Sequence, residues 1–289
     1  MRLIKRVTSR AVALETTLLV HGVPRDASLG LAGELDEIVR SEGSIPALVG
    51  VVKGAAVAGV NIDELSAMLD ADSVEKVNTA NLGYALHAGH DAATTVSSTM
   101  EIAAFAGLRV FATGGIGGVH RGYAERLDIS ADLLAFTRFP IAVVTSGVKS
   151  ILDVVSTREA LESLGITVVG FQTDAFPAFY LRDGGCGVDV RFDDPDELAG
   201  FVRNELPRSG RGIVIANPIP ESAELNRSDW KRWLKKAESR AIASGATGRD
   251  VTPAVLSGLH EVSDGRTLQA NIELVKSNAR VAAMIESRL

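Results

Sequence analysis

Short apolar runs rich in β-branched residues alternate with amphipathic segments along most of the chain, and this alternation limits the possible folds. The apolar runs predict buried strands, and the segments between them predict helices. Strands joined by helices form a largely parallel sheet with helices on both faces, so we expect an α/β fold. The predicted strands lie at 12–17, 47–52, 109–112, 141–145, 167–170 and 212–216.

Helical spacing of apolar residues recurs between the strands and continues to the end of the chain. Helices are predicted at 31–41, 61–70, 95–106, 128–136 and 150–164, and a helical tail at 228–244, 253–260 and 268–288. Asn61 suits the N-cap of the second of these helices. No repeat, low-complexity tract or Pro/Ser-rich linker divides the 289 residues, so we expect a single domain over 1–289.

The composition argues against several classes of partner. Aromatic residues make up only 5% of the chain and the net charge is −6, so we expect neither nucleic acid nor an anionic membrane as a partner. The single cysteine, Cys186, cannot form an intrachain disulfide. Glu15 interrupts the first apolar run, which argues against a signal peptide. Together these features favour a cytoplasmic protein.

Ligands of such sheets bind beyond the carboxyl ends of the strands, so the segments that follow strands are the candidate sites. A segment with five glycines, from Thr113 to Gly122, follows one predicted strand and contains His120 and Arg121. Exposed N–H groups in a glycine-rich loop can hold an anion. A tight turn without a ligand is the alternative.

Asp128 and Asp132 follow that segment with i, i+4 spacing, which places both carboxylates on one face of the predicted helix, with Ser130 close by. Two carboxylates and water suit a hard cation such as Mg²⁺ or Mn²⁺. Alternatively, Asp128 is only the N-cap of the helix.

Lys149 follows the strand 141–145 at the predicted start of a helix. The positive end of the helix dipole and partial burial would both lower the pKa of its amine, which suits a Schiff-base nucleophile. Glu15 lies in an apolar segment, where a raised pKa would suit a general acid. The alternative for Lys149 is a solvated lysine near a helix start, and the alternatives for Glu15 are one end of a buried ion pair or a strand edge. Lys76 could bind phosphate, or be simply exposed to solvent.

Several of these segments match one known family in order along most of the chain. The run from Val110 to Arg121 is the most specific of them. The other matches lie at 13–17, 21–24, 43–47, 93–96, 128–133, 147–153, 170–180 and 216–220. On these residues the chain closely resembles the pseudouridine-5′-phosphate glycosidases, the indigoidine-synthase-A-like family.

This resemblance implies an α/β/α sandwich that assembles as a homotrimer. It implies reversible cleavage of the C–C glycosidic bond of pseudouridine 5′-phosphate to uracil and ribose 5-phosphate. In this reading Lys149 forms an imine with the ring-opened ribose, Glu15 protonates the departing uracil, and Asp128 binds Mn²⁺ largely through water. The implied substrate contacts are Lys76, Val96, Thr113, His120, Ser130, Ala131, Asp132 and Asn271. Oxygen ligands accept Mg²⁺ as well.

The sequence departs from the family pattern near Lys76, where Ala80-Asn81-Leu82 stands in place of Arg-Asp-Leu and removes one positive charge. Two other functions stay open at this point. A Schiff-base aldolase or lyase on another sugar phosphate would keep Lys149 but would not need Asn271. A sugar-phosphate-binding protein without catalysis would not need Glu15.

Overall fold

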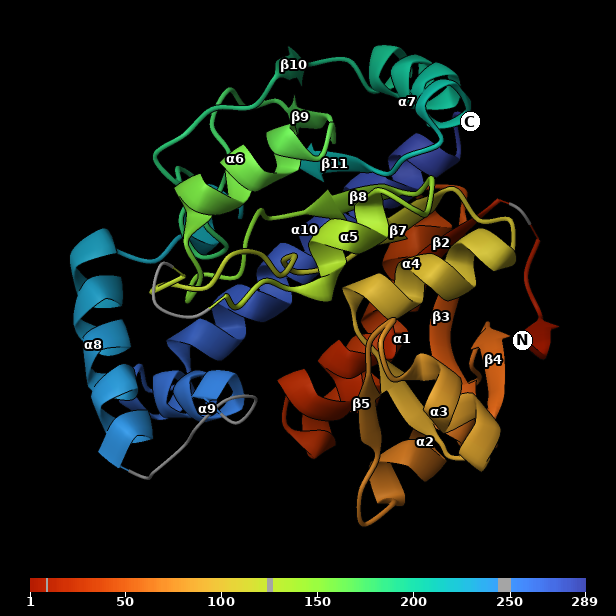
Figure 1. Ribbon diagram of the computed structural model, residues 1–289, viewed down its shortest axis with the longest axis horizontal. Helices are drawn as coiled ribbons and strands as arrows, with labels where there is room; N and C mark the ends of the chain where they lie inside the picture. The colour runs from red at the N-terminus through yellow and green to blue at the C-terminus, as the bar shows by residue number, and fades with distance from the viewer. Residues whose placement is uncertain (9, 124–126, 244–250) are drawn as a thin grey trace.

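The computed structural model describes residues 1–8, 10–123, 127–243 and 251–289. Eleven strands form one sheet, whose main path runs in the order β1-β4-β3-β2-β7-β8-β11-β9-β10 (Figure 1). The strands are β1 (Leu3–Lys5), β2 (Ala11–Glu15), β3 (Ile45–Val52), β4 (Ala55–Ala58), β5 (Glu75–Val77), β6 (Ala92–Thr94), β7 (Val110–Ala112), β8 (Ala142–Thr145), β9 (Val168–Phe171), β10 (Val190–Phe192) and β11 (Ile213–Ala216). Most pairs are parallel, and β3 is antiparallel to β4 and β6.

Helices cover both faces of the sheet. The α-helices are α1 (Arg25–Ser41), α2 (Ile62–Asp70), α3 (Leu82–Ala88), α4 (Val96–Phe105), α5 (Ala131–Phe136), α6 (Val154–Ser163), α7 (Pro195–Ser209), α8 (Arg227–Ala243), α9 (Val251–Val262) and α10 (Arg266–Glu286). A short π-helix, η1 (Leu18–Gly22), follows β2, and a 3₁₀ turn, η2 (Glu221–Ala223), precedes α8. In Figure 1, α10 lies along one side of the sheet, while α4, α5 and α6 lie on the other.

Two apolar cores separate three layers, as β2 illustrates. Val12 and Leu14 belong to the core that contains the apolar faces of α1, α7 and α10. Ala11 and Ala13 point the other way, into the core that contains α4 and α5. All five residues of β2 are buried, because a central parallel strand is covered on both faces. The predicted α/β/α sandwich with a mostly parallel sheet and a helical tail is therefore confirmed.

The longest strand, β3, extends past the end of β2 and carries a small addition to the sheet. Its pairing with β2 ends where Glu15 faces Val49. Beyond that point Gly50 pairs with Ala93 of β6, and β5 pairs with β6 so that Lys76 lies beside Ala93. Because β6 is antiparallel to β3, the end of β6 approaches the end of β2. This addition brings β5 toward the carboxyl edge of the central strands.

Sequence patterns located the central strands and most helices, with differences at their ends. The Asn61 cap is confirmed, because its side chain accepts a hydrogen bond from the N–H of Glu64 at 2.9 Å. The strands β1, β4, β5, β6 and β10 and the helices α3 and α7 were not predicted. Residue 244, the predicted end of α8, lies outside the described residues. Over the described ranges, no helix has the length and apolar character needed to cross a membrane.

Candidate active site

Glu15 and Thr113 meet at the carboxyl edge of the sheet. Glu15 ends β2, Thr113 follows β7, and the two strands pair in parallel with Leu14 beside Ala112. The Thr113 hydroxyl donates a hydrogen bond to Oε1 of the buried Glu15 carboxyl group. Burial raises the pKa of Glu15, although the positive charge of Lys149 and the Thr113 hydrogen bond both oppose this rise. A buried carboxyl group with a raised pKa can keep its proton and act as an acid.

Lys149 lies in the loop after β8, and its charge has a larger effect on Glu15 than any other ionisable group. The expected helix start at this residue is wrong. Asp153 caps α6, which begins only at Val154, so the dipole of that helix starts five residues after Lys149. The loop is held instead by backbone pairing, since the N–H of Lys149 donates to the carbonyl of Ile116 at 3.0 Å. Half-buried, Lys149 remains close to Glu15 without being the first residue of a helix.

Lys76 completes a group of ionisable side chains around Glu15. Desolvation lowers the pKa of Lys76, and the neighbouring charge of Lys149 lowers it further, while Glu15 and Asp132 oppose the change. A positive charge next to a lysine favours the neutral form of that lysine's amine, which is the nucleophilic form. The expected arginine would occupy the exposed turn at Ala80. There, Asn81 binds the turn by donating from Nδ2 to the Lys76 carbonyl at 3.3 Å.

In the glycine-rich segment, several of the N–H groups that could hold an anion are already bonded within the protein. Residues 113–119 are buried, and four consecutive or near-consecutive N–H groups already have acceptors in the protein. Ile116 donates to the Gly147 carbonyl, Gly117 to the Asp132 carboxylate, Val119 to the Thr157 hydroxyl, and His120 to the Asp128 carbonyl. The glycines serve close packing instead, since a Cβ at Gly115 would overlap the ring of Phe179.

Asp128 and Asp132 do not share a helical face, so that prediction is also wrong. The helix α5 begins at Ala131, and its N-cap is Ser130, whose hydroxyl accepts from the N–H of Asp132 at 3.2 Å. Asp132 is buried and accepts from the N–H groups of Gly117 at 2.8 Å and Ser97 at 2.9 Å. Asp128 is exposed and lies before the helix, because Ser130 is the residue that caps it.

The donors for a metal ion are few in this region. In the described residues, no three His, Cys, Asp or Glu side chains are grouped so that they could hold an ion. Both oxygens of Asp132 accept backbone hydrogen bonds, whereas Asp128 keeps an exposed carboxylate 3.7 Å from Nδ1 of the half-buried His120. One free carboxylate fits only an ion that keeps most of its water ligands.

Three further predicted contacts lie at different depths. Val96 is fully buried in the first turn of α4, and Ala131 is half-buried at the start of α5. Asn271, on α10, is 9% exposed, and its Oδ1 has no hydrogen-bond partner among the described residues. This oxygen lies against Gly114, where it would contact an added Cβ at 3.3 Å. A buried acceptor without a partner is a position where a ligand donor would be stabilised.

Asn278 is a residue of this region that the sequence did not reveal. It lies two turns after Asn271 on α10 and is fully buried. Its Nδ2 donates to the Thr113 carbonyl at 2.8 Å and to the Ser146 hydroxyl at 3.1 Å. Its Oδ1 accepts from Nδ2 of Asn217 at 2.9 Å. One amide thereby joins the ends of β7, β8 and β11 to α10. The helical period relating it to Asn271 was its only sequence signal.

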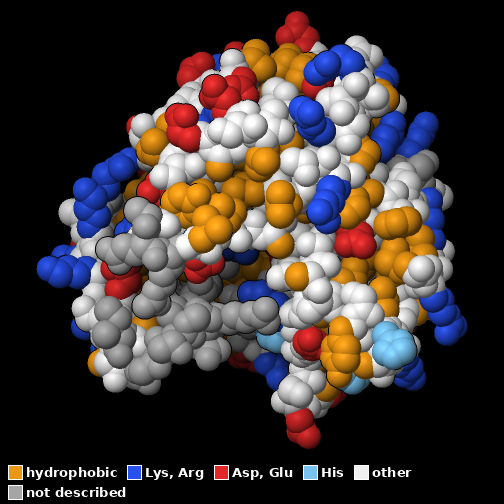
Figure 2. Space-filling model, in the orientation of Figure 1, with side chains coloured by type: hydrophobic (Ala, Val, Ile, Leu, Met, Phe, Trp, Pro, Cys, Tyr) orange, Lys and Arg blue, Asp and Glu red, His pale blue; other side chains and the backbone are white. Residues whose placement is uncertain are grey.

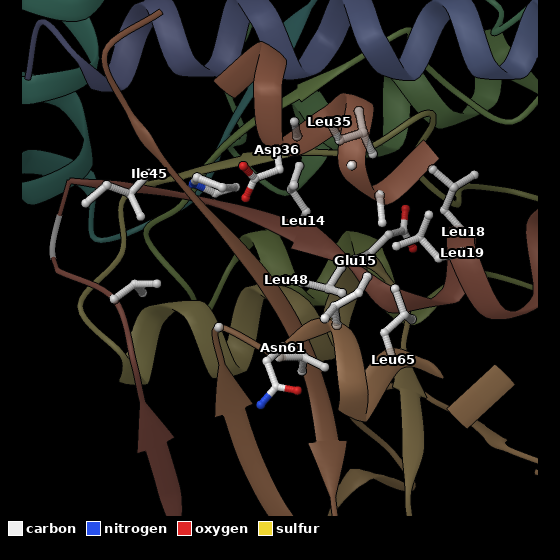
Figure 3. Close-up of a pocket in the computed structure, with 18 of the residues that line it drawn as sticks. Leu14, Glu15, Leu18, Leu19, Leu35, Asp36, Ile45, Leu48, Asn61 and Leu65 are labelled. Carbon is white, nitrogen blue, oxygen red and sulfur yellow. The ribbon is translucent and has the colours of Figure 1, made fainter. Parts of the chain in front are cut away.

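A cavity of about 570 Å³ borders Glu15 and Thr113 on the side of α1 (Figure 3). Leu14, Leu48 and Leu65 contribute to its largely apolar wall. Lys149 and Lys76 are not among the described residues that line it. The carboxyl group of Glu15 thus lies between this cavity and the side of the site where Lys149 and Lys76 act on it. Figure 2 shows a hollow near the centre of the viewed face, with Lys or Arg side chains in it.

A buried carboxyl group whose pKa is raised, close to two lysines at the carboxyl edge of an α/β/α sandwich, defines a candidate catalytic centre. The sequence model of the indigoidine synthase A like protein family matches residues 5–288. The chain therefore belongs to this family, as its sequence motifs indicated.

Named relatives and solved structures agree with this assignment. The chain is 44% identical over 280 residues to a pseudouridine-5′-phosphate glycosidase of Symbiobacterium thermophilum, covering 95% of this chain and 91% of the relative. It is 45% identical over 275 residues to one of Methylobacterium nodulans, covering 95% and 82%. An indigoidine synthase A-like protein of Thermotoga maritima superposes with a TM-score of 0.91 at 36% identity, covering 100% and 96%. Prealnumycin C-glycosynthase AlnA in complex with ribulose 5-phosphate gives 0.91 at 31% identity, covering 100% and 97%.

Proposed function

We propose that this protein is an enzyme that reversibly cleaves the C–C glycosidic bond of pseudouridine 5′-phosphate, giving uracil and ribose 5-phosphate. The observation that carries the proposal is the buried Glu15 carboxyl group, which has a raised pKa and lies beside Lys149 and Lys76. The names of the relatives from Symbiobacterium and Methylobacterium support the reaction. The ribulose 5-phosphate complex of AlnA supports a pentose phosphate as the sugar part.

A C-glycoside needs an electron sink, because its leaving atom is carbon. The Nζ of Lys149 adds to C1′ as the C1′–O4′ bond breaks, and O4′ takes a proton. Glu15 then gives its proton to C5 of the uracil while the C1′–C5 bond breaks and the nitrogen lone pair forms a C1′=N imine. Water hydrolyses the protonated imine, which releases ribose 5-phosphate, restores the amine of Lys149 and returns a proton to Glu15. Lys76 balances the charge of the phosphate.

Release of uracil from pseudouridine 5′-phosphate, measured by chromatography, tests the reaction. Lys149→Ala is expected to lose all turnover, and substantial turnover in that variant would refute the assigned nucleophile. Borohydride reduction during turnover, followed by peptide mass spectrometry, should place the trapped pentose on Lys149. The pKa of Lys76 is also lowered, so its amine could react with the sugar as well. The same experiment on Lys76→Ala is therefore the matched control. A trapped pentose on Lys76 of the unmodified enzyme would transfer the nucleophilic role to that residue.

The outcomes also separate the other two functions. If no uracil is released but borohydride still traps a sugar phosphate on Lys149, the protein is a Schiff-base lyase or aldolase on another sugar phosphate. If nothing is trapped and Glu15→Gln keeps the affinity for ribose 5-phosphate, it is a binding protein without catalysis.

We further propose that Asp128 holds Mn²⁺, with Mg²⁺ as a possible substitute. The exposed carboxylate of Asp128 supports an ion bound largely through water, close to Ser130 and Ala131. When bound, the ion would supply positive charge beside Asp128 and His120 at the edge of the site. Electron paramagnetic resonance titration of Mn²⁺ measures this binding independently of activity. Asp128→Asn should weaken it, and unchanged binding would remove Asp128 as the ligand.

The assembly and the location are also proposals. The family resemblance supports a homotrimer, and several exposed apolar side chains are available for contacts between chains: Phe105 (64% exposed), Leu127 (80%) and Leu134 (52%). Analytical ultracentrifugation should give the mass of three chains, and a monomer would contradict this.

The single cysteine supports a cytoplasmic location, which fractionation of the source cells tests. The single domain over 1–289 stays a prediction, and limited proteolysis tests it.

A further inference from the structure

A second cavity, of about 330 Å³, lies between α8 and the loops that follow β8 and β9. Its described lining contains Ser150, Trp230, Arg121, Arg227, Lys231 and Lys235, among others. None of the residues assigned to the proposed reaction lines it, although Ser150 directly follows Lys149. Figure 2 shows Lys and Arg side chains along the side of the molecule where Figure 1 places α8.

Positive charge exceeds negative charge around this cavity. Arg227, Lys231 and Lys235 have i, i+4, i+8 spacing, so they lie along one face of α8. Arg121 comes from the loop after β7. The described lining holds these four cations and two carboxylates, Asp183 and Glu238, which leaves two positive charges in excess. Since the whole chain carries a net charge of −6, the excess is local.

Among the described residues, the side chains of the two lysines have no ion-pair or hydrogen-bond partner, whereas those of the two arginines do. Arg121 lies 3.8 Å from Glu238, and Arg227 donates to the carbonyl of Asp183 at 2.7 Å. Within the described part of the chain, Lys231 and Lys235 form no ion pair. Two adjacent ammonium groups without partners provide a site for an oxyanion.

Apolar residues form the rest of the wall. Trp230 and Leu234, on the same helix, are nearly fully buried, and Ala178 and Leu181 lie opposite them. A volume of this size suits a small ligand and is too small for a dinucleotide.

We propose that this cavity is a second anion site, which binds a phosphate monoester or free phosphate between Lys231, Lys235 and Arg121. Arg121 also donates from Nη2 to the Ser150 carbonyl at 3.5 Å, so Arg121 would link a bound phosphate to the loop that carries Lys149. The site is separate from Lys76, which is assigned to the phosphate of the substrate.

Tryptophan fluorescence offers a direct test, because both tryptophans of the chain lie on α8 and Trp230 lines the cavity. Inorganic phosphate and ribose 5-phosphate are titrated separately, at constant ionic strength, into Lys76→Ala protein so that the substrate site contributes little. We expect a saturable signal. Equal affinities would show that free phosphate suffices, and tighter binding of ribose 5-phosphate would show that the site also contacts the sugar. Both results support the proposal.

Adding Lys231→Ala and Lys235→Ala should raise the dissociation constant by ~10-fold or more. The matched control is Lys236→Ala, which removes an exposed lysine of α8 that does not line the cavity, and it should leave the constant unchanged. Absence of saturation, an equal response to chloride, or equal affinity in the double variant and the control would overturn the proposal. None of these measurements uses turnover, so they stand whether or not the proposed reaction is confirmed.

Discussion

The hydroxyl of Thr113 donates to the carboxyl group of Glu15, and this contact joins the ends of two neighbouring parallel strands. A donor stabilises the charged form of a carboxyl group and lowers its pKa. Thr113 therefore limits a pKa that burial raises. It keeps Glu15 able both to give up its proton and to recover it in the reverse direction.

Replacing Thr113 by valine should move the pH profile. Loss of the donor raises the pKa of Glu15, so the protonated acid persists to higher pH and the alkaline limb of kcat shifts upward. The loss of one hydrogen bond is expected to lower kcat by ~10-fold. Thr99→Val removes a buried hydroxyl that bonds to Thr94, and serves as the control. An alkaline limb that stays in place in Thr113→Val would remove Glu15 as its source.

Glu15→Gln should separate activity from stability. Turnover is expected to fall by ~10² to 10⁴-fold, since the general acid is lost. The free energy of unfolding should rise at neutral pH. The folded-state pKa of Glu15 lies above its unfolded value, so the carboxyl group destabilises the fold as pH rises from the unfolded to the folded pKa. Melting temperatures of both proteins should converge in acid and diverge toward neutral pH. A variant less stable at neutral pH would contradict this reasoning.

The two aspartates should differ in their effect on folding. Asp132→Ala leaves the N–H groups of Gly117 and Ser97 without their acceptor, which is expected to destabilise the protein by about 3 kcal/mol. Asp128→Ala removes an exposed carboxylate and should change the stability by less than about 0.5 kcal/mol. Urea unfolding measures both. A loss for Asp132→Ala as small as the one expected for Asp128→Ala would mean that Asp132 has no structural role.

Gly147 fixes the course of the loop that leads to Lys149. Its φ is +80°, and an added Cβ would overlap the carbonyl oxygen of Pro177. Gly147→Ala is expected to destabilise the fold by about 4 kcal/mol or more. Gly200 provides the control, since it lies in α7 with open space around it, and Gly200→Ala should stabilise by up to ~1 kcal/mol. A Gly147→Ala protein with unchanged stability would show that the loop can take another course.

The parts of the fold that follow from local patterns could be predicted. The central strands are apolar throughout because both faces are covered, and Asn61 caps its helix through a contact three residues away. Residue positions that depend on contacts with distant parts of the chain could not be predicted. Nothing near Asp132 in sequence shows that its oxygens accept from Gly117 and Ser97, so the two aspartates were wrongly placed on one helix. Three-residue strands such as β5 carry too few residues for a periodic signal.

The same limit applies to the site. Glu15 stood out because a carboxylate in an apolar strand is unusual, and Lys149 because it follows a strand. Asn278 binds residues more than sixty positions away and carried no local signal. The buried glycine segment appeared open because its acceptors, such as the Thr157 hydroxyl, come from other elements.

The extension of β3 beyond β2 gives the two halves of the site separate supports. Glu15 ends β2 and Lys149 follows β8, and a change in either of these central strands would disturb both apolar cores. Lys76 stands on a strand pair joined to β3 through two residue pairs, Gly50 with Ala93 and Val51 with Ala92. A residue change near Lys76, the proposed phosphate contact, therefore affects this strand pair and leaves the central strands that hold Glu15 in place.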